Sequence, residues 1–111
     1  MAFERVCSLS ELPVNSAMEV LVRDEPYAIC NVNGEVTALY GICPHAGGPL
    51  GQGQVEESGR IVCPYHMWEF DCRTGRSAFV QTMGVPTYPV KVEGGEVFAD
   101  LLLRERHVRQ F

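Results

Sequence analysis

The sequence predicts an all-β domain, an antiparallel β-sandwich or small barrel, and three observations support this fold class. Short runs rich in Val, Ile, Tyr and Phe are separated by turn residues along most of the 111-residue chain. Asn33-Gly34 and Gly94-Gly95 each lie between two such runs, where they predict tight hairpin turns. Only one segment favours a helix, a single turn near the start where Ser8 and Glu11 have capping-box spacing.

The expected strands follow one another with one long interruption. In chain order they span residues 3–7, 18–22, 27–32, 36–40, 60–63, 76–79, 88–92 and 96–101. Between the fourth and the fifth, residues 41–59 contain six Gly and two Pro. Such a composition packs little core of its own. We therefore expect this stretch to form loops organised around something else and inserted between the strands of a β scaffold.

Length and composition set broad limits on the kind of protein. A chain of 111 residues predicts a single domain with a modest core, and a hydrophobic share of 46% argues against disorder. No apolar run reaches the ~18 residues that a membrane span needs. The first residues also lack the basic and apolar regions of a secretory signal. These features favour a cytoplasmic protein with no membrane partner.

The charge is acidic and unevenly distributed. Residues 104–111 hold three Arg and one Glu, so this tail has a net charge of +2. Because the whole chain has a net charge of −5, residues 1–103 carry −7. Nucleic acid is disfavoured as a partner, because phosphate binding needs a concentrated basic face. An acidic surface can steer docking to a basic partner or serve solubility alone. The sequence leaves both interpretations of the charge open.

Two short patterns, Cys43-Pro44-His45 and Cys63-Pro64-Tyr65-His66, carry the chemistry. Five cysteines are an odd count for a disulfide framework, and in a reducing compartment Cys clustered with His indicates metal ligands. The third histidine, His107, lies in the tail. The patterns therefore predict a metal site made of two thiolates and two imidazoles.

The spacing of these ligands favours a binuclear cluster over zinc. Zinc sites usually place two to four residues between paired ligands, frequently of the same type. Here one residue separates the first pair, each pair mixes sulfur with nitrogen, and seventeen residues lie between His45 and Cys63. In a [2Fe–2S] centre one iron can take both thiolates and the other both imidazoles. A zinc-stabilised binding module without redox function remains the remote alternative.

The surrounding residues resemble the Rieske ferredoxins. The resemblance rests on both metal patterns, on Trp68-Glu69-Phe70-Asp71 and Thr74-Gly75 after them, and on the ending Tyr88-Pro89-Val90-Lys91-Val92. It implies a Rieske fold over residues 1–103, in which an antiparallel β-sandwich base bears a small cluster-binding subdomain at about residues 41–72. Residues 104–111 would follow as a short basic tail.

The resemblance also assigns the ligands of the cluster. It implies that Cys43 and Cys63 supply the thiolates, and that His45 and His66 supply the imidazoles, of one Rieske-type [2Fe–2S] cluster near the surface. Leu50 would cap the cluster from the first loop, and residues 81–86 correspond to a third loop that covers it.

The chain departs from the high-potential members of this family at four positions. Gly48 and Tyr65 stand where those proteins have a disulfide, and Trp68 and Phe70 stand where they have Ser and Tyr hydroxyls directed at the cluster sulfurs. Hydrogen bonds to sulfur stabilise the reduced, more negative cluster. Their loss predicts a reduction potential near the low end of the Rieske range, about −150 mV.

The remaining residues narrow the function to an electron carrier without catalytic activity. A mononuclear iron site of the oxygenase type needs two more His, and only His107 is left. The chain has no dinucleotide fingerprint either. We expect it to carry one electron at a time from a flavin- and NAD(P)H-dependent ferredoxin reductase to a terminal oxygenase, such as an aromatic-ring dioxygenase. The alternative is a fixed small subunit of an NAD(P)H-dependent nitrite reductase, which also resembles Rieske ferredoxins.

Residues near the ligands have simpler expected roles. Tyr65, Met67 and Trp68 surround His66 and are expected to pack over the cluster and shield it from water. Cys30 is expected to be a buried free thiol on a strand, like Cys7, and Cys72 a turn residue.

Overall fold

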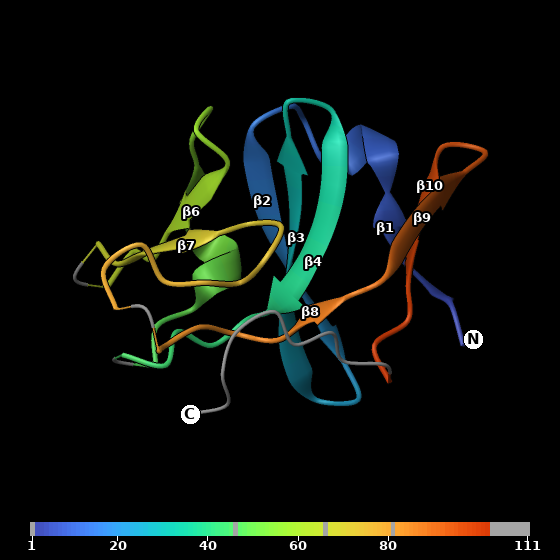
Figure 1. Cartoon of the computed structure of the whole chain (residues 1–111). Coiled ribbons are helices and arrows are strands. Elements are labelled where there is room, and N and C mark those ends of the chain that lie inside the picture. Colours follow the sequence, from blue (N-terminus) through green and yellow to red (C-terminus); the bar gives the residue numbers. More distant parts are fainter. Residues whose placement is uncertain (1, 46, 66, 81, 103–111) are drawn as a thin grey trace.

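The computed structural model describes residues 2–45, 47–65, 67–80 and 82–102, and its regular structure consists of short antiparallel strands and two 3-10 turns (Figure 1). One sheet has the order β1 (Glu4–Ser8), β10 (Glu96–Ala99) and β9 (Val90–Glu93). The central sheet has the order β2 (Ser16–Val22), β3 (Glu25–Val32), β4 (Glu35–Tyr40) and β8 (Thr87–Tyr88). A third sheet joins β5 (Gln54–Val55), β6 (Arg60–Val62) and β7 (Glu69–Asp71). The predicted all-β class is confirmed.

The central sheet separates two hydrophobic cores. Side chains alternate along β3, so that Ala28, Cys30 and Val32 face one core and Tyr27 and Ile29 face the other. The first core is completed by residues of β6 and β7, and the second by residues of β1 and β10. Figure 1 shows the β6–β7 region and the β1–β9–β10 sheet on opposite sides of β2, β3 and β4. Because both of its faces are covered, β3 is buried over most of its length.

The predicted hairpin turns are present. Asn33 and Gly34, between β3 and β4, have φ angles of 53° and 99°, and both values are positive as a type I′ turn requires. Gly94-Gly95 joins β9 to β10 with positive φ at both residues. A third hairpin of the same kind, at Arg23-Asp24 between β2 and β3, was not predicted, because Arg is not a turn residue and the pair lacks the glycine of the common two-residue turns.

The expected helical turn is confirmed as η1 (Leu9–Glu11), and the Glu11 carboxylate accepts the Ser8 N–H at 2.8 Å. The strand predicted at residues 76–79 is wrong, since only isolated bridges occur there. The Ser77 hydroxyl accepts the N–H groups of Phe79 and Val80, and this local bonding competes with a strand ladder. Two short strands, β5 and β7, were missed because their polar residues hide any alternation.

The β5–β6–β7 region is attached to the central sheet through packing and a few polar contacts. Ile61 and Phe70 lie in the same core as the β3 side chains. At the surface, the Arg73 guanidinium pairs with the Glu35 carboxylate at 2.7 Å. The Asn33 side-chain amide also donates to the Glu57 carbonyl at 3.1 Å. This base therefore holds the loops that project from β4 and β6 in fixed positions.

Within the described part of the chain, no helix has the length and apolar character needed to cross a membrane. The second 3-10 turn, η2 (Leu50–Gln52), leads from the loop after β4 toward β5.

Candidate metal centre

The first predicted ligand loop leaves β4 and folds back on itself. The Cys43 N–H donates to the Gly48 carbonyl at 2.9 Å, and the Gly47 N–H donates to the Cys43 carbonyl at 2.8 Å. At the base of the loop, the Leu50 N–H donates to the Gly41 carbonyl at 2.9 Å. These bonds satisfy the backbone locally, so that the loop keeps its shape without a strand partner at its tip.

The second predicted ligand loop connects β6 to β7 and is equally tight. The Cys63 N–H donates to the Trp68 carbonyl at 2.7 Å, which closes the chain around the residues between them. Met67 has a φ of 59°, a left-handed conformation that is uncommon for a residue with a side chain. The predicted ligand His66 lies outside the described residues.

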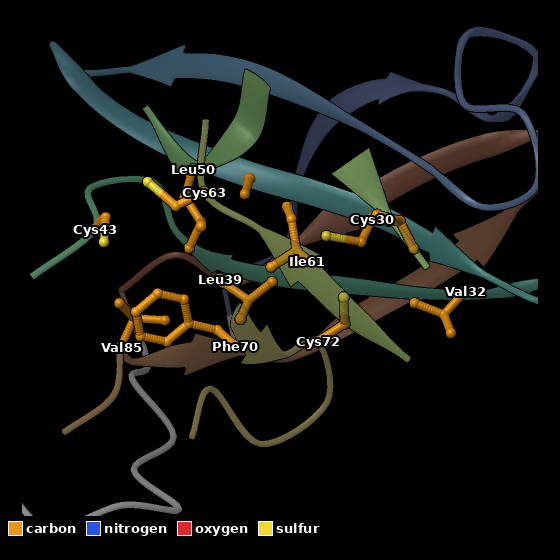
Figure 2. Packing of buried hydrophobic residues seen from close by; sticks show 12 residues of the cluster. Cys30, Val32, Leu39, Cys43, Leu50, Ile61, Cys63, Phe70, Cys72 and Val85 are labelled. Atoms are coloured by element: carbon orange, nitrogen blue, oxygen red, sulfur yellow. The ribbon is translucent and has the colours of Figure 1, made fainter. Parts of the chain in front are cut away.

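Two thiols from these loops meet in the first core. Cys43 and Cys63 are both 0% exposed, and neither forms a disulfide. Figure 2 shows their sulfur atoms at one end of the core, near Leu50 and Val85. Burial raises the pKa of the Cys63 thiol, as does the neighbouring Cys43 thiol, while a hydrogen bond with the Tyr65 backbone lowers it. A metal ion bound here would deprotonate both thiols, because coordination stabilises the thiolate form.

Gly48 provides the clearance beside this thiol pair. A Cβ placed on Gly48 would lie 2.7 Å from Cys63 Sγ and 2.9 Å from Cγ of the Tyr65 side chain. Glycine is therefore the residue that lets the first loop approach the Cys63 sulfur. Gly48 and Tyr65 lie against each other, at the two positions where the high-potential proteins have their disulfide.

His45 stands at the exposed rim of the site and stacks on a ring from the other loop. Its imidazole lies 4.1 Å from the Trp68 ring, centroid to centroid, with 12° between the planes. Trp68 is half-buried and packs against the first core. The edge of Trp68 in turn meets Phe79, with centroids 6.2 Å apart and planes at 89°.

The expected shielding by the three residues around His66 stays a prediction. Tyr65 and Met67 are 51% and 64% exposed, but the Tyr65 side chain also lies against Gly48 beside Cys63 Sγ. Trp68 packs against the first core. Sequence analysis did not single out Phe79, which is 59% exposed. No local signal marks it, because its contact with Trp68 joins segments that the sequence pattern does not connect.

The structure agrees with the expectations for Leu50, for the segment around Val85 and for the remaining cysteines. Leu50 and Val85 are buried in the same core as Cys43 and Cys63, which agrees with capping by Leu50 and coverage by the segment around Val85. Cys7, Cys30 and Cys72 are buried and free as well. Cys72 lies in the turn after β7, as expected.

Among the described residues, no group of three or more His, Cys, Asp and Glu side chains could hold a single metal ion. Each iron of the predicted cluster would take only two protein ligands, so the proposed arrangement needs no such group. The donor chemistry fits an iron–sulfur cluster, since two buried free thiols meet beside a glycine clearance and an exposed imidazole. The assignment of all four ligands remains a prediction, and the 104–111 tail also lies outside the described residues.

A cleft of about 270 Å³ opens beside the second loop and is lined by Val62, Cys63, Pro64 and Met67, among others. A cavity of about 320 Å³ lies elsewhere, between the end of β7 and the segment around β8, and Thr37 and Cys72 contribute to its wall. The smaller cleft is thus the one that adjoins a predicted ligand.

Comparisons with known proteins agree with this geometry. A family model for the Rieske [2Fe-2S] domain matches residues 2–89. The ferredoxin component of the naphthalene 1,2-dioxygenase system of Pseudomonas aeruginosa is 38% identical over 96 residues, covering 85% of this chain and 90% of that protein. A ferredoxin of Sphingomonas yanoikuyae B1 has a solved structure with a TM-score of 0.80 and 31% identity, covering 89% of this chain and 98% of that one.

The fold is also found in a Mycobacterium tuberculosis chain provisionally described as the small subunit of an NADH-dependent nitrite reductase. That structure gives a TM-score of 0.78 at 22% identity, covering 88% of this chain and 93% of that one. At this identity the likeness concerns the fold alone.

Proposed function

Because this chain belongs to the Rieske [2Fe-2S] domain family, we propose that it is a ferredoxin that carries single electrons from a reductase to a terminal oxygenase. In this proposal Cys43, His45, Cys63 and His66 hold one [2Fe–2S] cluster within residues 1–103. The observation that carries the proposal is the meeting of two fully buried free thiols from separate loops, with an exposed imidazole beside them.

The residues divide the work of such a carrier. When bound, the cluster supplies reversible one-electron chemistry. Cys43 and Cys63 hold their sulfur atoms in a core that excludes water, and Gly48 leaves the space that the Cys63 sulfur needs. His45 lies at the surface, so the nitrogen-ligated side of the site is the side that a partner can reach. The acidic body would favour encounter with a basic partner.

The direct test of this assignment is metal content. Protein purified without oxygen is expected to contain two iron and two acid-labile sulfide atoms per chain, and no stoichiometric zinc. His45→Ala and His66→Ala should each lose the cluster, whereas the matched control His107→Ala should retain it. Colourless protein with bound zinc would instead support the binding-module alternative.

The expected reduction potential distinguishes subtypes within the family. The positions that carry hydroxyl donors in high-potential proteins are Trp68 and Phe70, and Phe70 is fully buried here. We therefore expect a midpoint near the low end of the Rieske range, about −150 mV. A redox titration followed by EPR measures it, and a midpoint above zero would contradict the low-potential assignment.

The rival function is a fixed subunit of a nitrite reductase, which shares the fold with this chain. The ferredoxin proposal is better supported, because the naphthalene dioxygenase ferredoxin component is closer in sequence, at 38% identity. Purification from native cytoplasm separates the two. A shuttle should elute alone at the size of a small protein, whereas a fixed subunit should co-elute with a much larger redox enzyme.

A further inference from the structure

Three aromatic rings lie in contact at the exposed rim of the site. His45 comes from the first loop, Trp68 from the second, and Phe79 from the segment after β7. The first contact is a near-parallel stack at 4.1 Å, and the second is an edge contact at 6.2 Å. Both geometries are among the favourable arrangements of aromatic pairs.

Trp68 is held firmly where it stacks. Its carbonyl accepts the Cys63 N–H at 2.7 Å, and its ring packs against the first core. A ring stacked face to face cannot turn without losing its contact area, so Trp68 restricts rotation of the His45 imidazole. The stack also ties the two ligand loops to each other.

The exposure of Phe79 is built into the fold. The buried Ser77 hydroxyl accepts the Phe79 N–H at 3.1 Å, and the neighbouring Ala78 N–H donates to the Glu69 carbonyl at 2.8 Å. Single exposed apolar side chains are common on protein surfaces and need no explanation. Phe79 differs because its anchored ring touches the residue that stacks on a proposed ligand.

We propose that Trp68 is the positioning residue for His45, and that Trp68 and Phe79 form the apolar docking contact that a partner makes beside the exposed His45. This inference rests on the proposed function. Electron transfer weakens steeply with distance, so a partner packed on these two rings would be held close to the exposed His45. The cluster, when bound, would give up one electron, and the redox centre of the partner would accept it. Neither ring is oxidised, and no proton moves.

The partner that this surface fits is a basic electron-transfer protein with an apolar contact for Phe79. The apolar contact follows from the exposed ring, and the basic character follows from the net −7 carried by residues 1–103, given a total of −5 and a tail of +2. Mitochondrial cytochrome c, a basic protein with an exposed haem edge, is a suitable probe. The second-order rate constant for its reduction can be followed by stopped-flow absorbance.

Phe79→Ala is the decisive variant, because an exposed side chain can be removed without emptying the core. We expect full cluster content, an unchanged midpoint potential and a roughly tenfold lower rate constant with cytochrome c, as for loss of an aromatic contact residue. Val14→Ala is the matched control, since Val14 is 61% exposed but precedes β2, away from the ligand loops, and its rate should not change. A Phe79→Ala rate within about twofold of the wild type would overturn the docking role, since that is far below the effect of a contact residue.

The positioning role has a separate spectroscopic test. In the dithionite-reduced protein, Trp68→Leu should change the nitrogen hyperfine coupling of one histidine ligand and shift the midpoint potential, whereas Trp68→Phe, which keeps a ring, should largely restore both. Couplings that are unchanged in Trp68→Leu would overturn the positioning role. A wild-type protein that contained no cluster would refute the proposed function itself, whereas a loaded protein with insensitive variants would refute only this inference.

Discussion

The first core contains two pairs of buried cysteines that differ in one instructive respect. Cys43 and Cys63 meet at one end of the core, and Cys30 and Cys72 meet further along it (Figure 2). All four thiols are free and 0% exposed. Both pairs are therefore closed to solvent and bring two thiols together, and neither property alone distinguishes a metal site from a pair of packed thiols.

The surroundings of the two pairs make the difference. Cys30 lies on β3 and Cys72 follows β7, and neither residue has a histidine next to it in the sequence. Cys43 and Cys63 lie on loops that close on their own backbone, and His45 and His66 stand two and three residues beyond them. The proposed metal site therefore differs from the second pair in having histidines beside its cysteines on the same loops.

The largest expected effect comes from removing one thiol of each pair. Cys63→Ala should lose its iron and acid-labile sulfide, because one iron loses a ligand and nothing nearby replaces it. Cys72→Ala should keep the cluster and lower the unfolding free energy by about 1–2 kcal/mol through a small cavity. Iron and sulfide analysis measures the first effect, and thermal unfolding of the loaded protein measures the second.

The comparison would fail in either of two cases. A Cys63→Ala protein that retained a full cluster would remove Cys63 from the ligand set. A Cys72→Ala protein that lost the cluster but kept the wild-type far-ultraviolet circular dichroism would bring the second pair into the site.

The difference between the pairs was partly visible in the sequence. The ligand patterns and the Asn33-Gly34 turn are local, so their residue types and spacing are enough to predict them. The contact between Cys30 and Cys72 joins residues far apart in the chain, and no periodicity predicts it. The same holds for the stack of His45 on Trp68, which depends on how the two loops meet.

Met67 shows a second limit of sequence reasoning. Its left-handed φ of 59° follows from the closed backbone of the second loop, and nothing in a methionine predicts that conformation. Because the chain turns there, its side chain points to solvent, and an apolar residue beside a predicted ligand is exposed. Hydrophobicity alone therefore did not reveal how far Met67 is exposed.

Two neighbouring glycines test how closely the first loop must approach the thiol pair. Gly48→Ala would bring a Cβ to 2.7 Å from Cys63 Sγ, so it should reduce cluster content and lower the melting temperature. Gly47→Ala is the matched control, because no heavy atom lies within 4 Å of its added Cβ. Because Gly47 has a φ of 73°, an alanine there should lower the unfolding free energy by about 1–2 kcal/mol, but the variant should keep the cluster. Equal cluster content in both variants would contradict a role for the clearance.

The smallest expected effect concerns the second pair at alkaline pH. Contact with Cys72 and burial raise the pKa of the Cys30 thiol well above its ordinary value, while Thr37 lowers it. The folded protein therefore keeps this proton where the unfolded chain releases it, from about pH 8.5 upward. Because the native state then binds more protons, the unfolding free energy falls as pH rises from that point toward the folded pKa.

This contribution to the unfolding free energy is fully present below the pKa of the unfolded thiol. Above it, the unfolding free energy falls by at most about 1.4 kcal/mol per pH unit for one proton. Between about pH 8.5 and 10.5, the unfolding free energy of Cys30→Ala should fall less steeply than that of the wild type, because its unfolded chain has one thiol fewer to ionise. Cys7, whose pKa burial also raises, is present in both proteins and cancels from the comparison. Melting temperatures of the loaded proteins across this range measure the difference. Parallel curves would mean that the second pair titrates no differently when folded, and that the two pairs are more alike than their surroundings suggest.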